Sequence, residues 1–227
     1  MTYIPSSPEE KKFLEEFDPS QYQNPAVAAD TALFAADGNT LKVLLIRRGG
    51  YPYKGRWALP GGFVDIDEDI RDSAVRELEE ETGLTDIYIE QAFVWGKPDR
   101  DPRQRVITVS YIALADYAAL DAKAGDDAAE AEWFALTDWH MSETDDAVRI
   151  SYKLVGDETL SPVVEYPKGR MQDIVRIDDG GLAFDHAESV AYSFMCLKQR
   201  IQNGSLLDLS LSDETLRART KKVILAI

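Results

Sequence analysis

The segment from Gly62 to Leu84 limits the folds open to this chain more than any other, because a glycine-containing loop there leads into a strongly helical stretch. Within residues 69–82 the apolar residues Ile70, Ala74 and Leu78 recur at four-residue spacing, which is typical of a helix that buries one side. We therefore expect a helix at 69–82 that packs against the rest of the protein through this side.

The two ends of this helix carry residues that favour helix termini. Asp67 is a suitable N-cap, because its carboxylate can accept a hydrogen bond from the first turn. Glu68 and Asp69 favour the positive end of the helix dipole. Gly83 provides the C-terminal stop, since glycine readily adopts the left-handed conformation that ends many helices.

Glu77, Glu80 and Glu81 lie on one face of this helix, at about 100° per residue, and Leu78 points away toward the core. Like charges at these spacings weaken an isolated helix, so such a cluster persists when cations or an arginine neutralise it. Carboxylates on a rigid helix suit Mg²⁺ or Mn²⁺, which also bind substrate phosphates. A solvated acidic face is the alternative for an arbitrary string of glutamates.

Strand signals lie before and after the helix. Five stretches are rich in β-branched and aromatic residues, and several of them alternate, which predicts strands. These stretches are Ala29–Ala35, Leu41–Arg47, Ile87–Trp95, Val106–Ala115 and Glu130–Phe134. A helix packed on a mixed sheet indicates an α/β (α+β) sandwich.

The chain is expected to have three parts. Residues 1–21 form an N-terminal appendage with a short helix after Ser7, and residues 22–140 form the main domain. Residues 141–227 form a C-terminal extension packed on that domain, with a meander of three short strands followed by one or two helices. The expected bounds are Val148–Val155, Leu160–Tyr166, Met171–Ile177, Phe184–Ile201 and Asp213–Leu225.

The composition narrows the partners and the compartment. The formal net charge is −16 at pH 7, and an acidic surface repels nucleic acid phosphates and anionic lipids, so we expect neither as a partner. Cys196 is the only cysteine, so no internal disulfide can form. The chain start lacks a secretory leader, and no apolar stretch approaches the ~20 residues that span a bilayer. We therefore expect a soluble, cytoplasmic protein.

The fixed residues between positions 62 and 84 resemble the complete Nudix box, which reads glycine, five residues, glutamate, seven residues, then Arg-Glu-aliphatic-x-Glu-Glu-x-Gly-aliphatic. The matching residues are Gly62, Glu68, Arg76, Glu77, Leu78, Glu80, Glu81, Gly83 and Leu84. The resemblance implies an α/β/α sandwich around a mixed sheet and hydrolysis of a nucleoside diphosphate derivative. No box position is substituted, which favours an active enzyme.

The resemblance also implies a metal site for Mg²⁺, or alternatively Mn²⁺. Glu80 and Glu81 would be the principal ligands, with Glu77 as a further ligand and the backbone carbonyl of Gly62 as another. Such cations neutralise and orient a pyrophosphate and lower the pKa of the attacking water.

Arg76 would hold a carboxylate of the cluster in place, and Glu68 would brace the box by ion pairing. The base that takes the proton from water is either a box glutamate or an acidic residue on another loop. Candidates outside the box are Asp126, Asp127 and Glu130, for which a solvated loop is the alternative. Neither histidine of the chain is assigned a catalytic role.

Two flanking segments, 54–65 and 96–106, resemble the ADP-ribose pyrophosphatase branch and the closely related Nudix-type transcriptional regulators of NAD metabolism. Five arginines could grip the ribose phosphate and the diphosphate, and Trp57, Tyr53 or Trp95 could stack on adenine. The arginines are Arg47, Arg48, Arg100, Arg103 and Arg105. Surface ion pairing or core packing is the alternative for each of these side chains.

Three functions therefore compete. The first is hydrolysis of ADP-ribose to AMP and ribose 5-phosphate. The second is a regulator that senses ADP-ribose, although the 44 residues from Phe184 onward are few for a DNA-reading winged helix. The third is a Nudix enzyme for nucleoside triphosphates, NADH, sugar nucleotides or dinucleoside polyphosphates. Related ADP-ribose hydrolases are commonly homodimers with exchanged N-terminal elements, and residues 1–21 would serve that purpose here.

Overall fold

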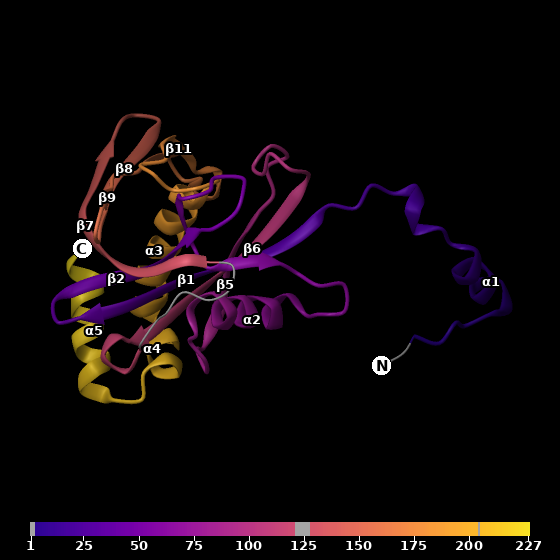
Figure 1. Cartoon of the computed structure of the whole chain (residues 1–227), viewed down its shortest axis with the longest axis horizontal. Helices are drawn as coiled ribbons and strands as arrows, with labels where there is room; N and C mark the ends of the chain where they lie inside the picture. Colours follow the sequence, from indigo (N-terminus) through magenta and orange to yellow (C-terminus); the bar gives the residue numbers. More distant parts are fainter. Residues whose placement is uncertain (1–2, 121–127, 204) are drawn as a thin grey trace.

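A mixed sheet forms the centre of the molecule (Figure 1). The computed structural model describes residues 3–120, 128–203 and 205–227, and eleven strands in these ranges join one sheet. Their order is β11-β10-β8-β7-β2-β1-β6-β5, with the short strands β3, β4 and β9 paired to β2, β1 and β8. The bounds are β1 (Ala26–Asp37), β2 (Thr40–Arg48), β3 (Trp57–Ala58), β4 (Gly61–Phe63), β5 (Ile89–Trp95), β6 (Val106–Asp116), β7 (Ala128–Glu143), β8 (Ala147–Val155), β9 (Thr159–Leu160), β10 (Val163–Pro167) and β11 (Val175–Asp178).

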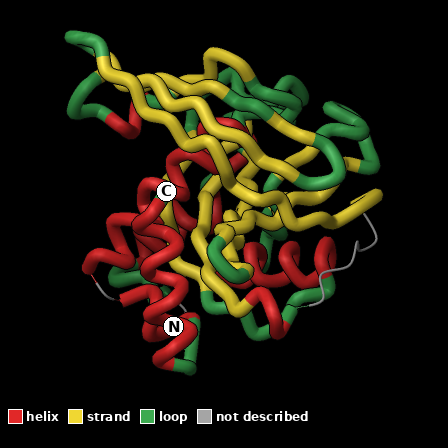
Figure 2. The backbone as a smooth tube through the Cα atoms, turned by 90° about the vertical axis from the view of Figure 1, so that its left-hand side faces the viewer, coloured by secondary structure: helices red, strands yellow, loops and turns green. Residues whose placement is uncertain are grey.

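Helices cover both faces of this sheet. Helix α2 (Ile70–Thr82) packs on one face, and α3 (His186–Asn203), α4 (Ser205–Ser210) and α5 (Glu214–Ala226) pack on the other. Figure 2 shows the twisted strands with helical segments beside them. The expected α/β/α sandwich is therefore confirmed. None of the helices in the described ranges has the length and apolar character needed to cross a bilayer.

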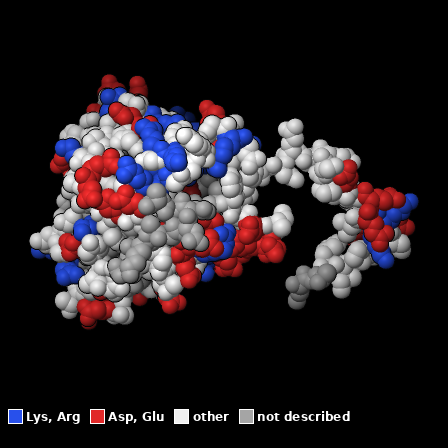
Figure 3. Space-filling view, in the orientation of Figure 1, with Lys and Arg blue, Asp and Glu red and all other residues white. Residues whose placement is uncertain are grey.

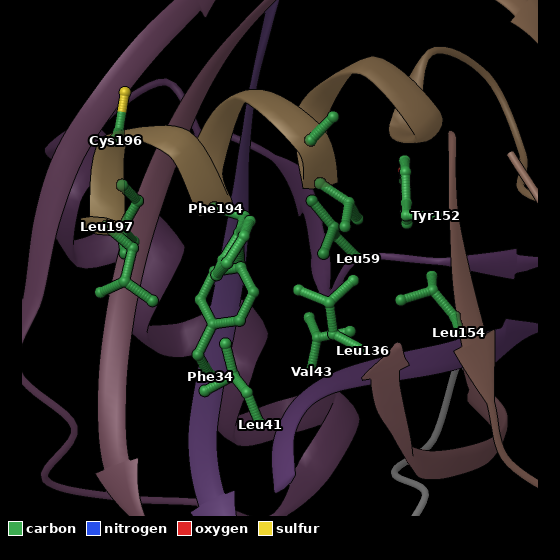
Figure 4. Packing of buried hydrophobic residues seen from close by; sticks show 14 of the residues in the cluster. Phe34, Leu41, Val43, Leu59, Leu136, Tyr152, Leu154, Phe194, Cys196 and Leu197 are labelled. Atoms are coloured by element: carbon green, nitrogen blue, oxygen red, sulfur yellow. The ribbon is translucent and has the colours of Figure 1, made fainter. Parts of the chain in front are cut away.

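The central strand β1 explains the two cores, because neighbouring side chains of a strand point to opposite faces. Leu33 packs with Leu78 of α2, whereas Phe34 belongs to the core beneath the C-terminal helices. The ring centroids of Phe34 and Phe194 lie 6.2 Å apart, and Figure 4 shows these two rings between β1 and α3. A strand buried on both faces reads as a nearly continuous apolar run.

The N-cap of helix α2 lies two residues after the expected one. Asp69, and not Asp67, is the N-cap, because its Oδ1 accepts a hydrogen bond from the backbone N–H of Arg71 at 2.9 Å. The other end is as expected, since Gly83 is left-handed with φ 71° and its N–H donates to the carbonyl of Glu79. The apolar spacing located the helix, but three consecutive acidic residues left the cap ambiguous.

The C-terminal extension enlarges the same sheet. Strand β7 runs from 128 to 143, so the division that we expected after residue 140 falls inside a strand, and β8 and β10 continue the antiparallel pairing. The expected strand 160–166 is broken at Ser161–Pro162 into β9 and β10, and the expected strand 171–177 begins as a 3-10 turn at Met171–Asp173. Helix α4 was not anticipated.

The N-terminal segment lies apart from this body. Helix α1 (Pro8–Glu16) is capped by Ser7, whose hydroxyl accepts a hydrogen bond from the N–H of Glu10, as the sequence predicts. The helix has no buried residue, and Figures 1 and 3 show it projecting away from the sheet. Phe13 and Phe17 contact each other and are both exposed.

Candidate active site

A glycine loop brings the box against strand β1. In the β1–β4 pairing, Asp30 lies opposite Gly61 and Ala29 lies opposite Gly62. A Cβ at Gly61 would be 2.4 Å from Asp30 Oδ1, and one at Gly62 would be 2.4 Å from the carboxylate oxygens of Glu77. Such contacts are too close for any side chain, so glycine at both positions lets carboxylates approach the loop backbone.

Arg76 gathers the carboxylates on the outer side of α2. Its Nε and Nη2 each donate to the carboxylate of Glu68 at 2.9 Å, and its Nη1 donates to Glu77 at 2.8 Å and to Glu80 at 3.0 Å. These contacts raise the pKa of Arg76, with the hydrogen bond to Glu68 as the main cause. One guanidinium thus offsets part of the repulsion among three carboxylates.

Glu81 faces the opposite way, into the protein. It is 8% exposed and accepts a hydrogen bond from the N–H of Gly61 at 2.8 Å. Burial, together with the nearby charges of Glu77 and Asp30, raises the pKa of Glu81 to about 8. A buried carboxylate with so little compensation is costly, so its environment fits a bound cation.

The three box glutamates are not equivalent. Glu77 and Glu81 line one cavity, whereas the Glu80 side chain is 56% exposed, is held by Arg76 and does not line it. Their oxygens do not form a compact cluster, because Arg76 binds Glu77 and Glu80 while Glu81 turns to Gly61. Carboxylates and backbone carbonyls are oxygen ligands of the kind that Mg²⁺ and Mn²⁺ prefer, so the residues present fit such an ion.

The cavity beside these glutamates has a volume of about 480 Å³. It is bounded by β1, β2, the glycine loop, α2, the segment 100–108 and the segment 184–186. The lining side chains that bear charge or an aromatic ring are Asp30, Arg48, Phe63, Asp65, Arg76, Glu77, Glu81, Arg100, Asp101, Arg103, Phe184 and His186. Acidic and basic groups therefore meet at one place, although the chain has a net charge of −16. Figure 3 shows groups of both signs on one face of the molecule.

Three of the five predicted arginines reach this cavity. Arg48 donates from Nε to the carbonyl of Pro52 at 2.9 Å and lies 4.8 Å from the ring centroid of Phe184. Arg103 pairs with Asp101 and lies 4.9 Å from the ring of Phe63. In the described part of the chain, no carboxylate lies within ion-pair distance of Arg48.

Arg100 is buried and already committed to the protein. Its Nε and Nη2 donate to Asp185 at 2.8 and 2.6 Å, and its Nη1 donates to Thr108 at 2.5 Å. This bidentate pair ties the segment 100–108 to the start of α3. The geometry therefore shows Arg100 holding the cavity wall together.

The other two arginines and the expected stacking tryptophans lie elsewhere. Arg47 donates to Gly55 and lies beside Glu130, and Arg105 donates to backbone carbonyls at its own loop. Trp57 is 2% exposed, donates to Glu158 and packs edge-on against Phe134. Trp95 is buried and donates to Ser110. The core encloses both tryptophan rings, so the expectation that either one stacks on adenine is at odds with this structure. The ring of Tyr53, the third candidate for stacking, packs on Phe184.

Of the three expected candidates for a base outside the box, Glu130 alone belongs to the described residues. Asp126 and Asp127 lie outside the part of the chain that the structure describes. Glu130 is part of a separate acidic group with Glu132 and Asp157, whose ligand atoms lie within 4.8 Å of one another. This group does not line the cavity.

The sequence analysis assigned no role to four residues that lie in or against the cavity, namely Asp30, Phe63, Asp185 and His186. Phe63 directly follows Gly62, whereas the other three come from distant segments. The segment 181–186 reaches the cavity by packing on β3: the N–H of Ala183 donates to the carbonyl of Trp57, and His186 Nδ1 accepts from the N–H of Leu59, both at 2.8 Å. Only the fold brings these segments together.

Comparisons with known proteins place this arrangement in a family. The NUDIX domain family matches residues 24–154, more than half of the chain. An ADP-ribose pyrophosphatase of Methanocaldococcus jannaschii is 43% identical over 129 residues, which are 56% of this chain and 73% of that protein. The ADPR responsive transcriptional repressor NtrR of Acinetobacter baylyi is 43% identical over 112 residues, 48% of this chain and 45% of the repressor, so the chain spans less than half of that relative.

Solved structures agree on the fold. A MutT/nudix family protein from Enterococcus faecalis superimposes with a TM-score of 0.69 and 29% identity, covering 99% of this chain and 88% of that one. The NUDIX domain of Shewanella oneidensis NrtR, solved with ADP ribose, gives a TM-score of 0.58 and 26% identity over 83% of this chain and 98% of that domain. With an intact box, a matching fold and a matching family, the chain belongs to the Nudix family.

Proposed function

We propose that this protein hydrolyses the pyrophosphate bond of ADP-ribose to give AMP and ribose 5-phosphate, with Mg²⁺ as the metal and Mn²⁺ as a substitute. The observation that carries the proposal is a single cavity that unites box carboxylates with arginine and aromatic side chains. Glu77 and Glu81 line one side, and Arg48, Arg103 and Phe63 line the rest. Relatives named ADP-ribose pyrophosphatase and NtrR support the choice of ADP-ribose.

The carboxylates would hold the metal. Glu77, Glu81 and the carbonyl of Gly62 supply oxygen ligands at the glycine loop, and Glu80 lies one turn of the helix from Glu77. A bound divalent ion neutralises the diphosphate and lowers the pKa of the attacking water. Arg76 hydrogen-bonds to Glu68, Glu77 and Glu80. These bonds would keep the ligand oxygens of Glu77 and Glu80 in place before the substrate binds.

The arginines and aromatic rings would bind the two ends of the substrate. Arg48 offers a half-buried guanidinium without a carboxylate partner in the described residues, and a guanidinium binds phosphate oxygens in pairs. Arg103 lies over the ring of Phe63. The guanidinium of Arg103 and the ring of Phe63 are both planar, so a planar nucleotide base can stack beside them.

Product analysis tests the proposal. The full-length protein with Mg²⁺ is expected to release equal amounts of AMP and ribose 5-phosphate from ADP-ribose, and Glu81→Gln is expected to abolish this release. Glu79→Gln is the matched control, because Glu79 is exposed on the same helix and does not line the cavity. Equal release by wild type and Glu81→Gln would refute the proposal. A panel with NADH, sugar nucleotides, nucleoside triphosphates and dinucleoside polyphosphates, compared by kcat/KM, separates ADP-ribose from other substrates.

The likeness to NtrR supports a second candidate, a regulator that senses ADP-ribose. The net charge of −16 gives it less support, because an acidic protein is repelled by nucleic acid phosphates. Helices α3 to α5 bury Phe194, Leu206, Val223 and Ile224 in the sheet core and so form one layer of the sandwich. A gel shift at low salt, with the promoter of a neighbouring gene of NAD metabolism, distinguishes the two: a shift that ADP-ribose reverses would favour the regulator.

We also propose that the protein is a homodimer in which the N-terminal arm, residues 3–22, packs on the second copy. The arm exposes Phe13, Leu14, Phe17 and Tyr22 to solvent in the single chain, and exposed apolar groups of this kind are typical of an interface. Light scattering of the full chain and of a variant starting at residue 23 tests this: the full chain should have twice the monomer mass and the variant should not. A cytoplasmic location stays a prediction.

A further inference from the structure

Asp30 is an acidic residue outside the box that shares its cavity. It lies on β1 and lines the same cavity as Glu77 and Glu81. Its side chain is only 10% exposed, and no hydrogen bond to its carboxylate is found among the described residues. A buried carboxylate without a donor is unfavourable and needs an explanation.

The position of Asp30 ties it to the box rather than to the core. It lies opposite Gly61 in the β1–β4 pairing, with its Oδ1 2.4 Å from the place where a Cβ of Gly61 would stand. The N–H of the same glycine donates to Glu81. Asp30 and Glu81 therefore approach one glycine from two sides. Burial raises the pKa of Glu81, and the charges of Glu77 and Asp30 add to this effect. Burial also raises the pKa of Asp30, and the charges of Asp185 and Glu77 add to it.

His186, the first residue of α3, lies close to Asp30. The N–H of Leu59 donates to its Nδ1 at 2.8 Å, so the proton of the neutral ring is on Nε2. Nε2 lies 3.9 Å from Asp30 Oδ2, which is beyond a direct hydrogen bond but makes the Nε2–H group a close neighbour of the carboxylate. Burial lowers the pKa of His186 to about 4, so at neutral pH the ring orients Asp30 and does not supply a compensating charge.

The charges of Arg100 and Arg48 favour the ionised form of Asp30, but neither arginine hydrogen-bonds to it. Arg100 is held by Asp185 through two hydrogen bonds, and Arg48 hydrogen-bonds to Pro52. A cation bound from outside the chain would give Asp30 a direct partner, and the neighbouring carboxylates of Glu77 and Glu81 fit a divalent ion.

We propose that Asp30 is a carboxylate of the divalent-cation site that lies outside the box, and that His186 is a positioning residue for it. The inference rests on the metal site of the proposed function. It extends that site from α2 to β1, so that the cation is held between a helix and a strand. Carboxylate oxygens on two rigid elements suit an ion that keeps strict geometry.

Binding of Mn²⁺ to the metal-free full chain tests the proposal. Free Mn²⁺ is measured by electron paramagnetic resonance in titrations of wild type, Asp30→Asn and Asp178→Asn. The control residue Asp178 is exposed on β11 and does not line the cavity. Asp30→Asn is expected to weaken Mn²⁺ binding by about 10-fold to 100-fold, the range for residues that support a metal site, and Asp178→Asn is expected to leave it unchanged. Equal Kd values for wild type and Asp30→Asn would overturn the proposal.

Thermal unfolding separates this role from a structural one. Asp30→Asn removes a buried charge, so its metal-free Tm should equal or exceed that of wild type, while the rise in Tm on adding Mn²⁺ should be smaller. A purely structural residue would lower Tm equally with and without the ion, and that result would overturn the proposal. Asp30→Ser, which keeps a small polar side chain, repeats both measurements if the asparagine variant does not fold.

A double-mutant comparison tests the role of His186. His186→Asn is expected to weaken Mn²⁺ binding in the wild-type background and to have no further effect in Asp30→Asn, because it acts through Asp30. An equal loss in both backgrounds would contradict this. These titrations contain no ADP-ribose, so a protein that binds Mn²⁺ through Asp30 but hydrolyses another substrate refutes only the proposed function.

Discussion

The guanidinium of Arg100 and the carboxylate of Asp185 form a buried, two-pronged pair across 85 residues of sequence. The pair joins the loop before β6 to the start of α3, and both of these segments line the cavity or lie against it. One wall of the candidate active site is therefore held together by a contact between two residues that lie outside the box.

Breaking this pair is expected to destabilise the protein strongly. Asp185→Asn leaves the buried Arg100 charge without its partner, and the loss of one member of a buried pair costs about 3–5 kcal/mol. Urea unfolding of wild type and Asp185→Asn measures the difference. Asp178→Asn is a surface control on β11 and should change the free energy of unfolding little. A loss below that of the control would show that the pair is not needed for stability.

Arg48 and Arg47 are neighbours on β2 and should behave differently. Arg48 lines the cavity and has no carboxylate within ion-pair distance in the described residues, whereas Arg47 lies beside Glu130 and Glu158. Arg48→Ala is expected to reduce kcat/KM for ADP-ribose by at least about 10-fold, since a charged hydrogen bond to a phosphate is worth about 1.5–3 kcal/mol. Arg47→Ala should change it much less. A larger loss of kcat/KM in Arg47→Ala than in Arg48→Ala would indicate that the phosphates bind on the other face of the sheet.

Phe63 and Trp57 should separate substrate binding from stability. The Phe63 ring is 37% exposed in the cavity and that of Trp57 is 2% exposed in the core. Phe63→Ala is expected to raise KM for ADP-ribose several-fold, as loss of a stacked ring costs about 1 kcal/mol, with little change in Tm. Trp57→Phe is expected to lower Tm and leave KM near that of wild type. Both are measured by steady-state kinetics and thermal unfolding; an unchanged KM in Phe63→Ala would exclude stacking there.

His186 should make the protein sensitive to acid. Its pKa is lowered to about 4 in the folded protein because burial disfavours the charged ring, whereas an unfolded chain has the ordinary value of about 6.5. The unfolded state therefore binds more protons between these values, so the contribution of His186 to stability is present above pH 6.5 and is lost as pH falls toward 4.

The comparison with His186→Asn isolates this effect. The gap in free energy of unfolding between wild type and the variant should shrink as pH falls from about 7.5 to about 4.5. Asp30 acts in the opposite direction, because burial raises its pKa to about 7, so the wild-type curve alone does not report on His186. A gap that is constant across this range would show that the ring is not held neutral.

The sequence predicted those parts of the molecule that depend on local spacing. Helix α2 follows from Ile70, Ala74 and Leu78, and the glycine loop follows from the box. The sequence could not decide between Arg47 and Arg48, because adjacent residues of a strand face opposite sides and only the pairing of β2 shows which side holds the cavity. Trp57 had the chemistry of a base-stacking residue, but the docking of residues 181–186 and the packing of Phe134 bury it. Asp30 lies within the expected strand 29–35, and only the pairing of β1 with β4 brings it opposite Gly61.

Because residues 181–186 pack on β3, the cavity is completed only late in the synthesis of the chain. The box, β1, β2 and the arginines that line the cavity are all translated before residue 110, yet one wall of the cavity arrives only with Phe184 and His186. A nascent chain shorter than this has its acidic residues in a cavity without that wall. A fragment that ends at the family match, residue 154, therefore keeps the box but lacks the wall opposite it.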